Sequence, residues 1–221
     1  MFKQVFELFK SDSLYNQALE ECHEMLDIDC EMFNESIKSL RESDTADIPI
    51  DIYAMDRKIN RFERDVRRKV MTHLAVSGRE DLGSGLILVS VVIDIERIGD
   101  YTKNIYDLAV QHPKKLNCGS FEDNVSKIEA SAKDFLNKTI STFKSQDIAS
   151  ARELMQEYKT EISSESSELV KSIISGSNDE FTSAQASAIC LYLRYLKRIS
   201  AHSRNLVSSI VNPFERIGYP E

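Results

Sequence analysis

The sequence has 221 residues, and its 36 acidic and 28 basic side chains give a net charge of −8. This charge repels polyanions, so we expect no nucleic acid among its partners. Basic residues between Arg57 and Lys69 alternate with acidic ones, which is typical of a solvated helix face, although a docking surface for an acidic partner stays open. Only seven glycines and four prolines occur, so long helices are expected.

The cysteines and the apolar segments predict a cytoplasmic protein. The four cysteines lack the spacing of a zinc site, and we expect them to be free thiols in a reducing compartment. The first residues, MFKQVFELFK, lack the features of a signal peptide. No apolar stretch reaches the roughly 18 to 20 residues that a membrane span needs.

The first half of the chain predicts three helices. Residues 1–42 form the first, with a break near Ser11–Ser13, where Asp12 or Ser13 would be the N-cap. Its apolar residues recur at helical spacing: Leu19, Cys22, Met25, Ile28, Met32, Phe33, Ile37 and Leu40. A polar loop at 42–49 precedes a second helix over 50–76, whose apolar stripe is Ile52, Met55, Ile59, Phe62 and Val66.

The third helix starts near residues 79–81 and has two apolar seams, which together predict a buried helix. One seam is Leu82, Leu86, Val89 and Ile93, and the other is Val91, Ile95, Ile98 and Ile105. His112-Pro113 and residues 117–120 mark a boundary. Three more helices are expected over 121–144, 147–175 and 180–211, followed by a C-terminal tail that packs back onto the bundle.

The two halves resemble each other. At an offset of 101 residues, segment 96–105 falls on segment 197–206, and the identical pairs are Arg97 with Arg198, Ile98 with Ile199, and Asn104 with Asn205. We therefore predict an all-α fold of two tandem three-helix bundles related by internal duplication, with six long helices. The expected division is a first bundle over 1–113, a linker over 114–119, a second bundle over 120–212 and a tail over 213–221.

An acidic pair occurs in the first half only. Glu96 and Asp100 lie one helical turn apart, whereas the second half has Lys197 and Ala201 in their places. Because the second bundle can fold without the pair, the pair is a candidate for another role. Two adjacent carboxylates repel each other unless they are solvated, paired with cations or bound to a metal ion.

The second helix adds a further set of oxygen ligands, so a metal site is one hypothesis. The full set consists of Glu96 and Asp100 on the third helix and Asp56, Asn60 and Glu63 on the second. Antiparallel packing of the two helices would bring these side chains together. Such oxygen ligands suit Mg²⁺, Ca²⁺, Mn²⁺ or an iron species. The alternative is a charge network in which the acids pair with Arg97, Lys103 or the arginines of the second helix.

Catalytic motifs are weak, so we predict a protein that is not an enzyme. Glu20 and His23 form a lone ExxH, whereas a di-iron enzyme of the ferritin type has this motif on two helices. The chain has no P-loop and no nucleophile elbow. The alternative function is a carboxylate-bridged metal-binding helical protein with redox or metal-storage activity.

The string Glu96-Arg97-Ile98-Gly99-Asp100, followed by Asn104-Ile105, resembles the PhoU family, the regulators of bacterial and archaeal phosphate uptake. It ends a helix that opens with Asp81-Leu82, and it follows a helix with Asp56 and Ile59. The duplicated three-helix plan is similar too. The resemblance covers about residues 15–211.

The resemblance implies a non-enzymatic cytosolic adaptor in phosphate uptake and phosphate-starvation signalling. Its partners would be a phosphate transporter, through an ATPase subunit or a permease, and a membrane sensor histidine kinase. It would associate peripherally with the membrane through these partners and form a homodimer.

The resemblance also implies metal binding. E/DxxxD motifs in some family members hold clusters of iron or other metals. Glu96 and Asp100 match such a motif, and Asp56 and Asn60 match it with an amide in place of the second acid. The second half departs from the motif at Lys197 and Ala201 and keeps only Glu157 and Glu161.

Overall fold

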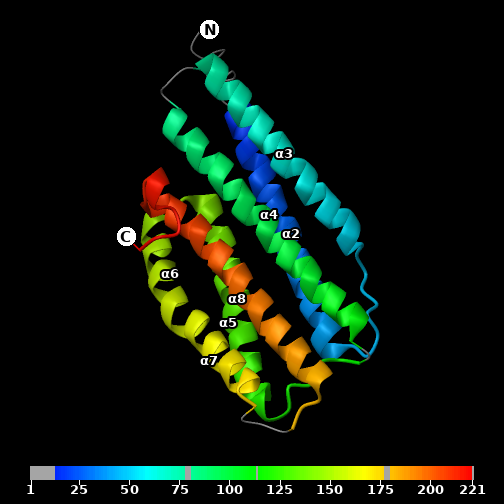
Figure 1. Ribbon diagram of the computed structural model, residues 1–221. Coiled ribbons are helices and arrows are strands. Elements are labelled where there is room, and N and C mark those ends of the chain that lie inside the picture. Colours follow the sequence, from blue (N-terminus) through cyan, green and yellow to red (C-terminus); the bar gives the residue numbers. More distant parts are fainter. Residues whose placement is uncertain (1–12, 78–80, 113, 177–179, 221) are drawn as a thin grey trace.

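The computed structural model describes residues 13–77, 81–112, 114–176 and 180–220, and every regular element in these ranges is a helix (Figure 1). The α-helices are α2 (Leu14–Glu42), α3 (Ile52–Ser77), α4 (Leu82–Gln111), α5 (Glu122–Ser145), α6 (Ile148–Glu161), α7 (Ser163–Ile174) and α8 (Ser183–Val211). Short 3-10 helices lie at Gly119–Phe121 and Phe214–Arg216. The predicted all-α fold class is confirmed.

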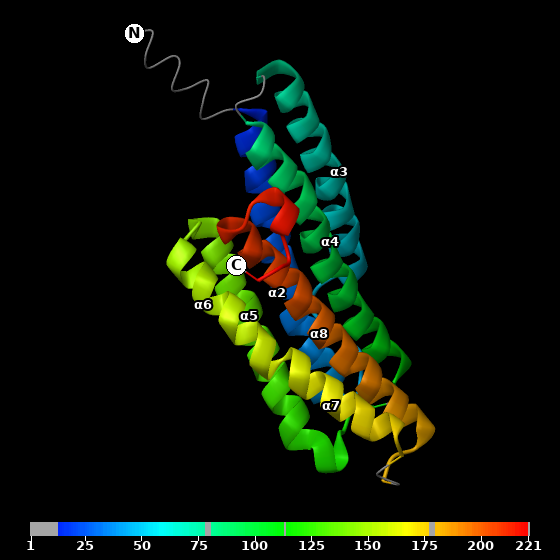
Figure 2. The ribbon, with the colours of Figure 1, turned by 60° about the vertical axis from the view of Figure 1, so that its left-hand side comes forward.

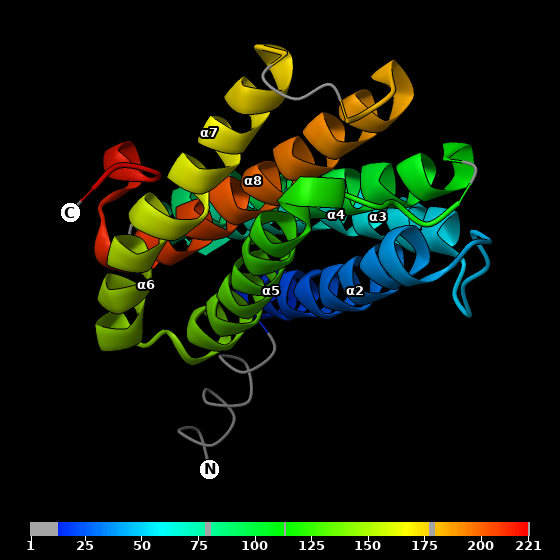
Figure 3. The ribbon, with the colours of Figure 1, turned by 90° about the horizontal axis from the view of Figure 1, so that it is seen from below.

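The helices pack in two groups of similar plan, as the predicted duplication requires. Helices α2, α3 and α4 pack on one another, and α5, α6 and α8 pack on one another. Helices α4 and α8 lie side by side and join the two groups (Figures 1 and 2). The view from below shows α5 crossing near α2 on the other side of this joint (Figure 3). The exact domain boundaries stay a prediction.

Polar side chains of the α4–α8 joint bond across it. The Asp94 carboxylate on α4 lies 2.7 Å from Nδ1 of His202 and accepts a hydrogen bond of 2.8 Å from Nδ2 of Asn205, both on α8. The ring of Tyr101 stacks on His202, with the centroids 5.7 Å apart. The two groups therefore meet in a specific register rather than through apolar contact alone.

Helix starts follow the capping residues of the sequence. The predicted Ser13 cap is confirmed, because its Oγ accepts a hydrogen bond from the backbone N–H of Asn16. Thr182 and Gln185 form a reciprocal capping box at the start of α8. The part of the predicted first helix over residues 1–12 lies outside the described residues.

The single helix predicted over 147–175 is two helices, α6 and α7, which meet at Ile162. The side chain of Ile162 is buried and anchors the break in the core. The next five residues, SSESS, are poor helix formers because serine hydroxyls compete for backbone groups. Indeed, Oγ of Ser167 donates to the carbonyl of Ser163 over 2.8 Å, a bond that bends helices.

The two apolar seams predicted on α4 differ in burial. Val91, Ile95, Ile98 and Ile105 are fully buried, as predicted. On the other seam, Leu82, Leu86 and Ile93 are 46%, 39% and 38% exposed, so the prediction of a helix buried on both seams is wrong. Helices α2, α3 and α8 cover only part of the circumference of α4, and this stripe faces outward.

The C-terminal tail packs back onto the bundle, as predicted. Asn212 Nδ2 donates to the carbonyls of Arg216 and Tyr219 over 3.0 and 2.7 Å, and the N–H of Gly218 donates to Ser208 Oγ over 2.7 Å. Gly218 has a φ of 84°, which favours glycine at this turn. Within the described residues, no helix is both long enough and apolar enough to cross a bilayer.

Candidate functional site

The predicted site residues lie on two neighbouring antiparallel helices and are partly buried. Glu96 and Asp100 belong to α4, and Asp56, Asn60 and Glu63 belong to α3. Lys103 of α4 joins the helices, because its Nζ lies 2.8 Å from Oδ1 of Asp56 and 3.3 Å from Oδ1 of Asp100. The two oxygen stripes therefore lie side by side, as the antiparallel packing predicts.

Cationic side chains hold most of these acids. Besides Lys103, Arg97 contacts Asp100 at 2.8 Å and Glu96 at 3.5 Å. Glu63 pairs with Arg67, one turn further along α3, at 2.8 Å. This arrangement is the charge network that the sequence offers as the alternative to a metal site.

Asn60 bonds within its own helix. Its Nδ2 donates to the backbone carbonyl of Asp56 over 3.0 Å and to the Oδ2 of the same residue over 3.3 Å. The amide thus orients the Asp56 carboxylate from one side, while Lys103 contacts it from the other. Because the side-chain N–H groups of Asn60 donate to Asp56, Asn60 helps to position that acid.

A third helix contributes an acid that the sequence reasoning missed. Asp29 of α2 is completely buried, and neither carboxylate oxygen has a hydrogen-bond partner among the described residues. Its carboxyl group faces Gly99 of α4, since a Cβ built at Gly99 would lie 2.8 Å from Asp29 Oδ1. A signal existed in the sequence: Asp29 lies at helical spacing between Met25, Leu26 and Phe33, all of which are buried.

The local electrostatics disfavour negative charge in this cluster. Burial raises the pKa of Asp29 well above its usual range, and the charges of Glu96, Asp56 and Asp100 raise it further. Burial also raises the pKa of Glu96, with Asp100 adding to the effect and Arg97 opposing it. Burial alone would lower the pKa of Lys103, but its bonds to Asp56 and Asp100 raise it instead. The cluster therefore attracts a proton or a cation.

The second half has a different polar arrangement at the equivalent positions. Lys197 of α8 donates from Nζ to Oγ of Ser167 over 2.6 Å, and Ala201 packs against the core. The side chains of Glu157 and Glu161, which the sequence leaves as a fragment of a site, lie outside the described part of the chain. The acidic cluster built on Glu96 and Asp100 is thus a feature of α2, α3 and α4.

Comparisons with known proteins concern both the first half of the chain and the whole fold. Residues 22–109, which span most of α2, all of α3 and most of α4, match the family model of the PhoU domain. Among curated proteins, none matches the sequence significantly.

Two crystal structures share the fold. PhoU from Pseudomonas aeruginosa has a TM-score of 0.80 and 21% identity, over 92% of this chain and 97% of that one. The phosphate transport system regulatory protein PhoU from Streptococcus pneumoniae has a TM-score of 0.77 and 17% identity, over 89% of this chain and 93% of that one. These similarities show that the fold extends through both halves.

Proposed function

Because residues 22–109 match the family model of the PhoU domain, we propose that this chain regulates phosphate uptake and phosphate-starvation signalling. The family match is the observation that carries the proposal, and the PhoU fold over most of the chain supports it. Such a regulator works by binding other proteins and needs no catalytic group. We therefore propose an adaptor rather than an enzyme.

The partners that we propose are a phosphate transporter, through its ATPase subunit or permease, and a membrane sensor histidine kinase. In this proposal, the adaptor works in the cytoplasm and reaches the membrane only through these proteins. The exposed stripe of Leu82, Leu86 and Ile93 on α4 supports docking, because exposed apolar side chains in a row are characteristic of interaction surfaces.

Deletion of the gene in the source organism, with phosphate uptake measured in high and low phosphate, tests the regulatory proposal. We expect uptake to lose its response to external phosphate, and restoration by the wild-type chain. Complementation of the deletion strain with the double variant Leu86→Asp, Ile93→Asp tests the docking stripe. The matched control is Ile148→Asp, because Ile148 on α6 is 51% exposed. An unchanged phosphate response in the deletion strain contradicts the proposed function.

Homodimer formation is a further proposal, and the same exposed stripe on α4 supports it. Light scattering after size-exclusion chromatography measures the mass directly against the 25.2 kDa of one chain. We expect twice that mass for the wild type. A single-chain mass at tens of micromolar protein contradicts the proposal.

Metal binding at Glu96, Asp100, Asp56, Asn60 and Glu63 stays a prediction, and the residue types fit iron, Mg²⁺, Mn²⁺ or Ca²⁺. The oxygens of Asp29, which have no hydrogen-bond partner in the described part of the chain, also favour a cation. The arrangement fits poorly, however: within the described ranges, no group of three or more His, Cys, Asp or Glu side chains is placed to hold a metal ion. Lys103 and Arg97 already contact these acids, so we derive no step of the function through a metal.

Metal analysis of the purified protein tests this prediction and the alternative of a redox or metal-storage protein. The metal-site prediction requires near-stoichiometric metal in the wild type and its loss in the variant with Glu96→Ala and Asp100→Ala. Equal metal content in both proteins excludes a site at this pair. Redox turnover of bound iron would favour the alternative function.

A further inference from the structure

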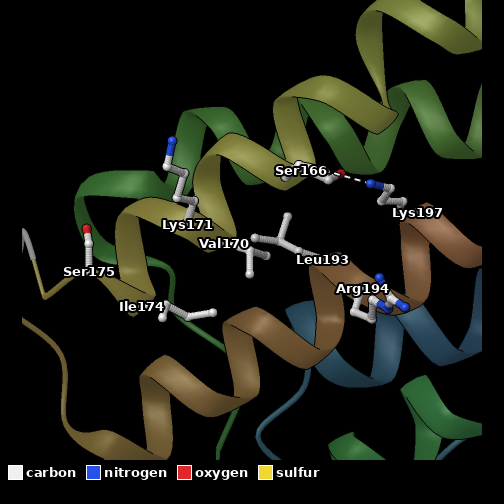
Figure 4. Close-up of a pocket in the computed structure, with 9 residues that line it drawn as sticks. Ser166, Val170, Lys171, Ile174, Ser175, Leu193, Arg194 and Lys197 are labelled. Carbon is white, nitrogen blue, oxygen red and sulfur yellow. Dashed lines mark hydrogen bonds between the residues drawn. The ribbon is translucent and has the colours of Figure 1, made fainter.

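A groove of about 410 Å³ lies between α7 and α8 (Figure 4). It exists because α7 turns away at Ile162 and packs on α8 and the end of α6, whereas α6 packs on both α5 and α8. This volume is within the range of small-molecule sites, which are about 300–1,000 Å³. The groove is far along the chain from the acidic cluster, and no part of the proposed regulatory function uses it.

The groove has apolar walls from both helices. Val170 and Leu193 point toward each other across its centre, and Ile174 points into the same space from the last turn of α7 (Figure 4). Ile174 is 75% exposed, although it belongs to the most apolar class of side chains. Leu193 is fully buried and forms the floor of the groove, whereas Val170 is partly exposed. An alkyl chain lying on Val170 and Ile174 would remove their exposed surface from water, which is favourable in proportion to the area covered.

Cations line the same groove, and none of them has an acidic partner among the described residues. Arg194 and Lys171 form no ion pair there, and Lys197 donates only to the neutral hydroxyl of Ser167. Among the residues that the structure describes, no acidic one lines the groove. This contrasts with Lys103, which contacts two carboxylates. In a chain of net charge −8, such a concentration of unneutralised positive charge is complementary to an anion.

A buried hydroxyl adds a polar group to the lining. Ser166 is only 1% exposed, and its Oγ has no hydrogen-bond partner among the described residues. Buried hydroxyls are normally bonded, so an unpartnered one beside a groove suits a ligand with an acceptor oxygen. The groove thus combines apolar walls with a hydroxyl and two cations on α8, at Arg194 and Lys197.

We propose that the groove between α7 and α8 binds an amphiphilic anion, that is, an alkyl chain with a carboxylate or phosphate head group. The alkyl chain lies on Val170 and Ile174, above the buried side chain of Leu193, and the head group lies near Arg194 and Lys197. This inference does not rest on the proposed regulatory function, so either can fail without the other.

Calorimetric titration of the full chain with dodecyl phosphate and with laurate, both below their micelle concentrations, tests the proposal. We expect one-to-one binding of at least one of these anions, and the preferred head group distinguishes a phosphate ester from a fatty acid. Dodecyltrimethylammonium has a similar chain with the opposite charge, and inorganic phosphate has a head group with no chain. We expect both of these controls to bind at least about tenfold more weakly.

Two exposed groove positions and two matched positions elsewhere provide the variants. Arg194→Glu reverses the head-group charge, and Ile174→Asp places a carboxylate on the apolar wall. Arg68→Glu on α3 and Ile148→Asp on α6 make the same changes on exposed surfaces away from the groove. Circular dichroism of all four variants checks that they stay folded.

We expect each groove variant to weaken binding of the anion about tenfold or more, and the matched variants to bind like the wild type. The proposal is overturned if neither anion binds. It is also overturned if the alkyl ammonium or inorganic phosphate binds as tightly, or if the groove variants and their matched variants bind equally.

Discussion

Asp29 on α2 and Gly99 on α4 lie directly opposite each other in the core of the first helix group. A methyl group at position 99 would lie 2.8 Å from Asp29 Oδ1, so only glycine leaves room for the buried carboxyl. The core thus accommodates an acid that has no hydrogen-bond partner among the described residues, beside Glu96, Asp56 and Asp100. Both members of this pair are direct targets for mutation.

Replacement of the buried acid, Asp29→Asn, is expected to stabilise the protein at neutral pH. The amide has the shape of the acid but never acquires the negative charge that burial and Glu96 disfavour. We expect a gain of about 1–3 kcal/mol in the free energy of unfolding, measured by urea denaturation at pH 7. A loss of stability would show that the Asp29 carboxylate is bound to a cation.

The pH dependence checks the same effect. Because the pKa of Asp29 is raised in the folded protein, the folded state binds more protons than the unfolded state above the usual aspartate pKa. Its contribution is therefore fully present below that pKa and is lost as the pH rises through the raised value. We expect the advantage of Asp29→Asn to grow over this interval, and a difference that is constant from pH 4 to pH 8 contradicts this explanation.

The opposite member, Gly99→Ala, is expected to destabilise the protein. The new methyl group would meet Asp29 Oδ1 at 2.8 Å and Ile59 Cδ1 at 2.9 Å, and overpacking a core costs about 1–3 kcal/mol. Gly83→Ala is the control, because Cβ at that helical position meets nothing within 4 Å. Alanine there gains up to about 1 kcal/mol from helix propensity. Thermal melts of the two variants should shift in opposite directions.

Removal of the bridging cation by Lys103→Met should destabilise the protein by about 1–2 kcal/mol, since it leaves Asp56 and Asp100 without the shared ammonium group. Mg²⁺ should recover part of this loss by screening the two acids. Lys69→Met is the control, because Lys69 also joins two helices but contacts a single acid, Glu21, at 2.6 Å. Urea denaturation of both variants, with and without Mg²⁺, should show a larger Mg²⁺ effect for Lys103→Met; equal effects would contradict the shared bridge.

Arg41 of α2 bonds to the start of the second helix group. We expect Arg41→Met to lower the free energy of unfolding by about 2 kcal/mol. The guanidinium group donates to the Leu116 carbonyl and contacts Glu122 and Glu129, the latter at 3.1 Å. Both acids are partly exposed, so the loss is less than for a fully buried pair. Lys38→Met, which removes an exposed pair with Glu35, should change the stability by less than about 0.5 kcal/mol. Similar losses in the two variants would exclude a specific role for Arg41.

Particular residues show how far the sequence predicts this fold. The repeated apolar positions predicted the helices correctly, because the periodicity of apolar residues along a helix does not depend on what the helix packs against. They could not separate the seam of Val91 and Ile95, which is buried, from that of Leu86 and Ile93, which is exposed, since both seams are equally apolar. Which of them is covered depends on the position of α8, about a hundred residues further along the chain.

The candidate site was predictable in part for a similar reason. Charge and spacing picked out Glu96 and Asp100 on one helix and Asp56 on its neighbour. Asp29 was missed because the predicted apolar stripe of the first helix used Ile28 in its place, although Ile28 is only partly buried. A single acid inside an apolar pattern is easily taken for a surface residue. Its importance depends on Gly99, which only the packing of α2 on α4 reveals.

The joint between α4 and α8 has a consequence for the speed of folding. Asp94 and His202, which meet there, are 108 positions apart in the chain, whereas α2, α3 and α4 follow one another through short connections. Closing the longer loop costs more entropy before any contact repays it. We therefore expect each helix group to assemble early and the joint to form last, so that weakening it mainly accelerates unfolding and leaves the folding rate almost unchanged.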